Sequence, residues 1–186
     1  AKRGDIGSTF AAYADAWLSP GSPLESDALT VSPYLGFGSL EPAFNHVREH
    51  GKGLFVLAAT SNPEARSVQT AKREDGRSLA QAMVDDALAF DSPLDTHVNS
   101  IGVVLGATLN LADFDIDTAA APATPALPVL APGFGAQGAR IEDAKAIVGG
   151  VGWALLANES RGILSGGAKG LAERIRTRSD VLAEAL

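Results

Sequence analysis

The sequence predicts an α/β fold in which a parallel sheet is covered by helices. Within its 186 residues, five short apolar stretches typical of strands each precede a loop and a helical stretch. Each stretch is an unbroken apolar run rather than an alternating one, which indicates burial on both faces, as in parallel sheets. Polar residues cluster just after these runs, and in parallel α/β folds that edge of the sheet carries the functional site.

The expected elements alternate along the chain. The expected strands cover residues 28–31, 53–58, 101–105, 127–130 and 153–157. The expected helices cover residues 40–50, 78–90, 142–148 and 168–186. The second helix has its apolar residues at spacings of three and four, which is the helical period. Trp17, Met83 and Trp153 are expected in the core.

The number of strands is too small for a closed eight-stranded α/β barrel. Such a barrel needs about 250 residues, roughly 30 for each βα unit. One further strand would end at Lys2, which leaves about two units unaccounted for. Residues 1–186 are therefore expected to form a single domain. That domain is either an open sheet or the C-terminal three quarters or so of a barrel whose N-terminal part is not shown.

Composition limits the classes of partner. The formal net charge is −7, which disfavours a nucleic-acid partner because such binding needs a basic stripe. A small anionic ligand is still compatible, since a few local cations can outweigh the net charge inside a cleft. No apolar run reaches membrane-spanning length, so no membrane partner is expected. Cysteine is absent, which excludes disulfides and thiolate metal sites and favours a cytoplasmic location.

The first nine residues carry side chains suited to catalysis. Lys2 ends an expected strand, and Asp5 follows three positions later, where a strand would point it to the opposite face. If a helix begins at Ser8, Asp5 and Thr9 lie one helical turn apart and away from the site that Lys2 faces. This arrangement suggests a site shared across a subunit interface. The alternative is a solvated strand end with Ser8 or Thr9 as a helix N-cap.

A second group of residues near the C-terminus is suited to binding an anion. Gly133, Gly135 and Gly138 let the backbone approach an anion closely, and Gln137 supplies a side-chain donor. Arg161 follows an expected strand and offers a planar fork that matches phosphate. Barrels often bind phosphate with the loops after their last two strands. The alternative for Arg161 is a surface cation.

Two other patterns have a weaker basis. Residues 133–138 fit the G-x-G-x-x-G dinucleotide fingerprint, and Glu159 lies where a ribose carboxylate would be expected. However, Pro132 precedes the pattern, the next helix is short and only one strand follows. His46 and His50 have a spacing that can bind metal, but no carboxylate pair completes the site, so no metal is expected.

The first segment resembles a known family motif. Residues 2–9, Lys-Arg-Gly-Asp-Ile-Gly-Ser-Thr, resemble the D-x-K-x-x-D-I-x-x-T signature of the orotidine 5′-phosphate decarboxylase family, in its longer bacterial variety. Four further segments agree in order. They are residues 30–36 after the next strand, the pyrimidine-side loop 60–63 with Gln69 downstream, the phosphate loop 132–138 and the last phosphate contact 160–162.

The resemblance implies a (β/α)8 barrel with the first two or so βα units missing from the visible chain. The family motif has an aspartate two residues before the lysine, and the family has an earlier aspartate and lysine on its first two strands. None of these three has a counterpart in the sequence. They are expected to lie in an N-terminal segment that is not shown.

The resemblance also implies a reaction: decarboxylation of orotidine 5′-phosphate to uridine 5′-phosphate (UMP), the last step of pyrimidine nucleotide synthesis, without a cofactor. A preorganised charge array would stabilise the carbanion at C6 of the ring. Lys2 would protonate that carbon. Asp5 would come from the neighbouring subunit of a homodimer, Thr9 would join it at the ribose, and Ile6 would line the pocket. Ser61 would contact the pyrimidine, or else serve as a turn or cap residue ahead of Pro63.

Two alternative functions are left open. The first is a metal-dependent sugar-phosphate decarboxylase or aldolase of the same superfamily, which chelation would inactivate. The loop at residues 60–63 argues for the pyrimidine enzyme instead. The second is a binding module for phosphoribosyl ligands without turnover, since the visible chain lacks half of the family's charged tetrad.

Overall fold

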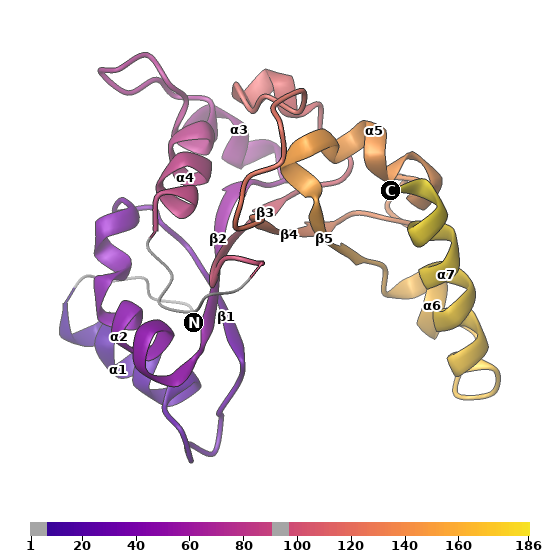
Figure 1. The fold of residues 1–186 in the computed structure, drawn as a ribbon, viewed down its shortest axis with the longest axis horizontal. Coiled ribbons are helices and arrows are strands. Elements are labelled where there is room, and N and C mark those ends of the chain that lie inside the picture. The colour runs from indigo at the N-terminus through magenta and orange to yellow at the C-terminus, as the bar shows by residue number, and fades with distance from the viewer. Residues whose placement is uncertain (1–6, 91–96) are drawn as a thin grey trace.

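The computed structural model describes residues 7–90 and 97–186, and its core is a five-stranded parallel sheet (Figure 1). The strands are β1 (Ala28–Val31), β2 (Gly53–Ala59), β3 (Ile101–Leu105), β4 (Pro128–Pro132) and β5 (Ala154–Asn158). They lie side by side in chain order, and each neighbouring pair is parallel. All five strands therefore end at the same edge of the sheet, and the predicted parallel α/β class is confirmed.

Helices connect the strands and pack around the sheet. The α-helices are α1 (Ser8–Leu18), α2 (Glu41–His50), α3 (Pro63–Gln69), α4 (Leu79–Leu88), α5 (Ala144–Val148), α6 (Arg161–Leu164) and α7 (Leu171–Ala185). Short 3₁₀ segments are η1 (Phe37–Leu40), η2 (Leu111–Phe114), η3 (Ile141–Asp143) and η4 (Gly149–Gly152). Helix α1 packs on α2 and β1, α4 on β2 and β3, and α7 on η3 and α5. In Figure 1 the group α5–α7 lies on the opposite side of the sheet region from α1 and α2.

Burial on both faces holds for the central strand but not for its neighbours. Every residue of β3 is buried, whereas Leu54, Val56 and Ala58 of β2 are buried and alternate with half-buried residues. Strand β5 has no fully buried residue. Its second face has no cover among the described residues, so an unbroken apolar run does not by itself guarantee two-sided burial.

Local signals explain where the helices begin and end. Helix α2 ends at Gly51, whose φ of 63° is the left-handed conformation that glycine adopts at a helix C-terminus. Helix α4 begins after Ser78, whose side chain accepts a hydrogen bond from the Gln81 N–H. Helix α3 was not predicted. It begins at Pro63 and buries no residue, so it has no apolar period that a sequence pattern could reveal.

The three expected core residues have different outcomes. Met83 is buried, and Trp17 is partly buried against the core cluster. The prediction for Trp153 is wrong, because its side chain is 69% exposed. Trp153 lies just before β5, at the edge of the sheet, where the described part of the chain supplies no neighbouring strand to cover it.

Candidate functional site

The carboxyl ends of the strands bring several of the predicted site residues to one edge of the sheet. The last residues of β4 and β5, Pro132 and Asn158, are register partners. The loop 133–138 and the segment 159–161 follow directly, so they leave the sheet side by side. Ser61 follows β2 at the same edge because the strands are parallel.

The loop after β4 depends on glycine for its backbone shape. Gly133, Gly135 and Gly138 have φ values of 129°, 70° and 113°, in the region that side chains disfavour. The Gly135 N–H donates to the Ala139 carbonyl at 2.8 Å, and the Gly138 N–H donates to the Gly135 carbonyl at 2.9 Å. These two amides are therefore used inside the loop. The glycines shape the loop, and donors other than these two amides must serve a ligand.

Gln137 and Arg161 are the side chains that can supply those donors. Both are exposed, and Arg161 is the first residue of α6. Over residues 7–90 and 97–186, no ion pair joins Arg161 to a carboxylate. Its planar guanidinium is therefore available to a ligand phosphate.

Glu159 holds the two loops against each other, a role that the sequence did not reveal. Its side chain is only 7% exposed, and Oε2 accepts a 2.7 Å hydrogen bond from Arg178 of α7. A Cβ built on Gly135 or on Gly162 would meet Glu159 Oε1 at 2.4 Å and 2.0 Å. The carboxyl group thus fills the space between the two backbones, and both positions are glycine.

The same contacts argue against the dinucleotide interpretation of residues 133–138. In that interpretation Glu159 would present its carboxylate to a ribose. The carboxylate is instead nearly buried and paired with Arg178. The fingerprint is better explained by the left-handed turns of the loop and by its packing against Glu159.

Ser61 lies in the turn between β2 and α3 and is exposed. The neighbouring Gly106 at the end of β3 is close enough that a Cβ there would lie 3.4 Å from the Ser61 nitrogen. The Gly106 N–H also donates to the Ala59 carbonyl at 2.8 Å. The turn that carries Ser61 is therefore set against the end of the central strand.

The structure describes only one of the predicted N-terminal site residues. Lys2, Asp5 and Ile6 lie outside the described residues. Thr9 is exposed in the first turn of α1, on a shallow helix face. That face is formed by Ser8, Thr9, Ala12, Tyr13, Ala16 and Trp17. The structure thus brings loop 133–138 together with Arg161, and Ser61 to the same edge, while the predicted catalytic pair stays a prediction.

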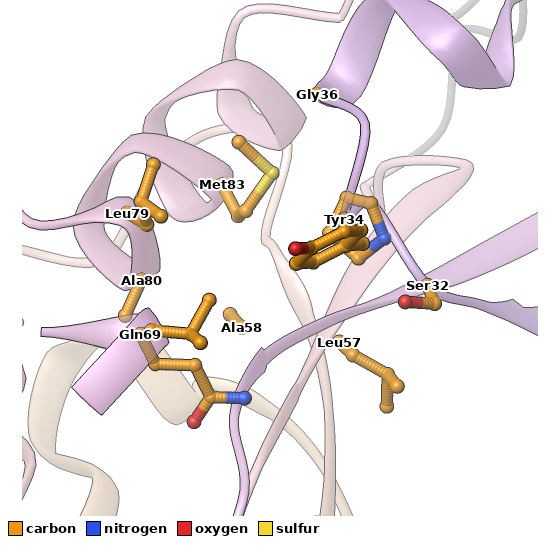
Figure 2. A pocket seen from close by; sticks show the side chains of 11 residues that line it. Ser32, Tyr34, Gly36, Leu57, Ala58, Gln69, Leu79, Ala80 and Met83 are labelled. Atoms are coloured by element: carbon orange, nitrogen blue, oxygen red, sulfur yellow. The ribbon is translucent and has the colours of Figure 1, made fainter. Parts of the chain in front are cut away.

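A cavity of about 180 Å³ lies near the ends of β1 and β2 (Figure 2). Its lining is mostly apolar and includes Tyr34, Leu57, Gln69 and Met83. Figure 2 shows Tyr34 on the side of the cavity opposite Gln69. Gln69 and part of the segment 30–36, both noted in the resemblance, line this cavity, whereas Thr9, Ser61, Gln137 and Arg161 do not.

The histidine pair is not arranged as a metal site. His46 Nε2 lies 2.9 Å from Asp15 Oδ1, a contact that ties α2 to α1. Within the described ranges there is no group of three histidine, aspartate or glutamate side chains that could hold a metal ion. In the same ranges no helix combines the length and the apolar character needed to cross a bilayer.

Comparison with known proteins places this geometry in a family. The profile of the "Orotidine 5'-phosphate decarboxylase / HUMPS family" matches residues 1–170. The chain is 51% identical over 171 residues to orotidine 5′-phosphate decarboxylase of Corynebacterium efficiens, covering 90% of this chain and 58% of that relative. It is 50% identical over 168 residues to the Streptomyces coelicolor enzyme, with the same two coverages.

Solved structures show the same relationship. A Streptomyces avermitilis protein described as an orotidine 5′-phosphate decarboxylase has a TM-score of 0.87 at 47% identity, covering all of this chain and 63% of that one. Leishmania donovani OMP decarboxylase has a TM-score of 0.68 at 30% identity, with coverages of 98% and 65%. The chain spans about 58% of the length of the curated relatives it matches. The five parallel strands agree with a family of α/β barrels. The chain belongs to the orotidine 5′-phosphate decarboxylase / HUMPS family.

Proposed function

We propose that the protein carrying this chain decarboxylates orotidine 5′-phosphate to UMP without a cofactor. The observation that carries the proposal is that the loop 133–138 lies next to the segment 159–161, which includes Arg161. Both lie at the sheet edge that also carries Ser61. This arrangement offers an anion site and a separate polar group on one edge. The curated relatives at about 50% identity are named for this reaction.

The phosphate end is the better defined half of the proposed site. Arg161 supplies a charge-assisted pair of donors, and Gln137 supplies a neutral one. The net charge of −7 makes a local cation valuable for attracting an anionic substrate. Binding energy at the phosphate, remote from the reacting carbon, can be used to hold the ring where the transition state is stabilised.

The chemical step is assigned to residues 2–9. The bond between C6 and the carboxylate breaks, CO₂ leaves, and the electron pair stays on C6. The Lys2 ammonium stabilises the negative charge that develops on C6 and then transfers a proton to that carbon. Asp5 and Thr9 hold the lysine and the ribose, and Ile6 lines the ring pocket.

A homodimer with shared sites follows from the same assignment. The α1 face near Thr9 combines the small residues Ala12 and Ala16 with the partly buried Tyr13 and Trp17. Small residues flanked by aromatic ones let a second helix approach closely, so a second copy of the chain is the proposed occupant. Asp5 of one copy would then complete the site that contains Lys2 of the other.

Lys2→Ala tests the proton-donor role. The variant is expected to lose turnover of orotidine 5′-phosphate while keeping its thermal unfolding temperature, because the change removes a group at the site. Asp5→Ala is expected to be inactive as well. If the site is shared, mixing the two inactive variants should restore about a quarter of the wild-type activity, since half of the dimers regain one intact site. Substantial turnover by Lys2→Ala alone would reject the assignment.

Arg161→Ala tests the phosphate site. Loss of a charge-assisted hydrogen bond is expected to weaken UMP binding by about ten- to a hundredfold. Uridine, which lacks the phosphate, should bind the variant and the wild type equally. Titration calorimetry with the two ligands measures both effects. An equal loss for UMP and uridine would show that Arg161 does not bind the phosphate.

The two alternative functions predict different results in these assays. A metal-dependent sugar-phosphate enzyme of the same superfamily would lose activity in a chelator, whereas the proposed enzyme would not. A binding module would bind UMP but release no CO₂ from orotidine 5′-phosphate. Release of labelled CO₂ from orotidine 5′-phosphate in the presence of a chelator identifies the proposed enzyme. Binding of UMP without any release, with or without the chelator, identifies the binding module.

A further inference from the structure

We infer that Gln69 is a positioning residue that fixes Ser61 for the pyrimidine ring, an inference that rests on the proposed function. Gln69 is the last residue of α3, whereas Ser61 lies in the turn that precedes this helix. The side chain of Gln69 folds back onto that turn and binds the residue before Ser61 at two points.

The two contacts use both ends of the Gln69 amide. Its Oε1 accepts a hydrogen bond from the Thr60 backbone N–H at 2.9 Å, and its Nε2 donates to Thr60 Oγ1 at 3.0 Å. Thr60 Oγ1 in turn donates to Asn62 Oδ1 at 2.7 Å. The residues on both sides of Ser61 are thus tied into one chain of hydrogen bonds that begins at Gln69.

The turn needs such a link because its packing is limited beyond the close approach of Gly106. Ser61 is exposed, and α3 buries none of its residues, so packing alone does not fix this segment. The register between β2 and β3 also shifts after Leu57, at the end of the strand. A two-point bond to a planar amide restricts the rotation of the backbone at Thr60 and therefore the direction of the Ser61 hydroxyl.

Packing in turn fixes the orientation of Gln69. Its side chain is half-buried and lines the cavity of about 180 Å³, whose lining also includes Ala80 and Met83. Figure 2 shows Gln69 at the Ala80 side of the cavity, with Tyr34 across from it. Because this lining is mostly apolar, a methionine in place of Gln69 would keep the packing of the stem and lose only the amide.

The role proposed for Gln69 predicts an effect on ligand binding that a general loss of protein stability would not produce. If Gln69 acts through Ser61, its loss should weaken binding of the ring and leave binding of the phosphate and ribose unchanged. Ribose 5-phosphate carries those two groups without a ring. The ratio of the dissociation constants for UMP and ribose 5-phosphate therefore isolates the contribution of the ring.

The experiment compares Gln69→Met, Ser61→Ala and the double variant with the wild type, in the intact protein. Each single variant is expected to weaken UMP binding by about five- to tenfold and to change ribose 5-phosphate binding by less than about twofold. The double variant should bind UMP about as well as either single one, because both changes remove the same contact. Thr60→Ser keeps the hydroxyl and should behave as the wild type, whereas Thr60→Val should weaken UMP binding.

Hydrogen exchange tests the bond itself without any ligand. Exchange of the Thr60 amide should be faster in Gln69→Met than in the wild type, and unchanged in Ser61→Ala. The inference is overturned if Gln69→Met leaves UMP binding intact while Ser61→Ala weakens it, if both ligands weaken equally, or if the two effects add. A wild type that binds UMP no better than ribose 5-phosphate would instead refute the proposed ring site, and the inference with it.

Discussion

Two glycines of this chain differ in the space that an added side chain would find. Gly102 is buried in the central strand, where an added Cβ would lie 2.3 Å from the Pro128 carbonyl oxygen of the next strand. Gly38 lies exposed in η1, and an added Cβ there would meet no atom within 4 Å. Neither has a left-handed φ, so the surroundings alone separate them.

Gly102→Ala is expected to lower the free energy of unfolding by about 2 kcal/mol or more, because the backbone of β4 must move to admit the methyl group. Gly38→Ala is the matched control, and it should be neutral or stabilising by up to about 1 kcal/mol. Urea unfolding of both variants measures the difference. Equal stability of the two variants would contradict the close approach of β3 and β4.

Some features of single residues could be predicted from the sequence and others could not. The sequence predicted that the glycines of residues 133–138 form a loop, and their positive φ values agree with the need for glycine. Anion binding by this loop stays a prediction. The use of the Gly135 and Gly138 amides inside that loop was not foreseen. Neither was the place of Glu159 between two glycines, since nothing in a sequence shows which buried carboxylate faces which backbone.

At the scale of the element, α4 depends on a buried cap. Ser78 accepts a hydrogen bond from the Gln81 N–H at 3.0 Å and donates to the Phe114 carbonyl at 2.5 Å. Its own N–H donates to Asp115. One residue therefore starts the helix and also ties it to η2, which follows the central strand.

Ser78→Ala is expected to lower the free energy of unfolding by roughly 2–4 kcal/mol, the sum of a lost cap and a buried carbonyl left without its donor. Ser67→Ala in α3 is the control, because that residue is exposed and its hydroxyl makes a single long contact within the described part of the chain, 3.4 Å to the Glu64 carbonyl. Its effect should stay within about 0.5 kcal/mol. Thermal and urea unfolding report both values, and equal effects would mean that the cap contributes nothing.

The elements themselves were mostly predictable. The strands and the helices α2, α4 and α7 agree with the expected ranges within a few residues, because their apolar residues recur at the strand or helix period. Helices α3 and α6 were missed. They have only 7 and 4 residues, too few for the helical period of apolar residues that α2, α4 and α7 show.

At the scale of the whole molecule, acidic side chains paired with cations make the stability of the fold depend on pH. The Lys72 ammonium and the Ser78 N–H hold the pKa of Asp115 below its ordinary value of 3.8. Arg77 lowers the pKa of Asp75 in the same way, and Lys52 lowers that of Glu25 from 4.5. In each case the folded state binds a proton less readily than the unfolded state.

The sign of the pH effect follows from this difference. The stabilisation is fully present above the ordinary pKa values of 3.8 and 4.5 and is lost as the pH falls through the lowered values of the folded protein. The free energy of unfolding should therefore be level above about pH 5 and fall below it. Asp115→Asn should reduce the slope of that fall, measured by urea unfolding between pH 3 and pH 7.

Asp180→Asn is the control for this series, because Asp180 is exposed on α7 and has no ion-pair partner among the residues described. Its stability curve should run parallel to that of the wild type at every pH. An unchanged acid slope in Asp115→Asn would show that the pair with Lys72 does not contribute to stability. Added salt should weaken the effect, since these pairs are at the surface.

The sequence by itself determined the parallel α/β class, the positions of the strands along the chain and the residues that follow them, because apolar periods and turn residues are local properties of the chain. Only the tertiary structure decided that Glu159 lies between Gly135 and Gly162, that Gln69 binds Thr60, and that Trp153 is exposed at the sheet edge. These facts depend on contacts between segments that no period or motif connects. They follow from how the strands and helices pack in three dimensions.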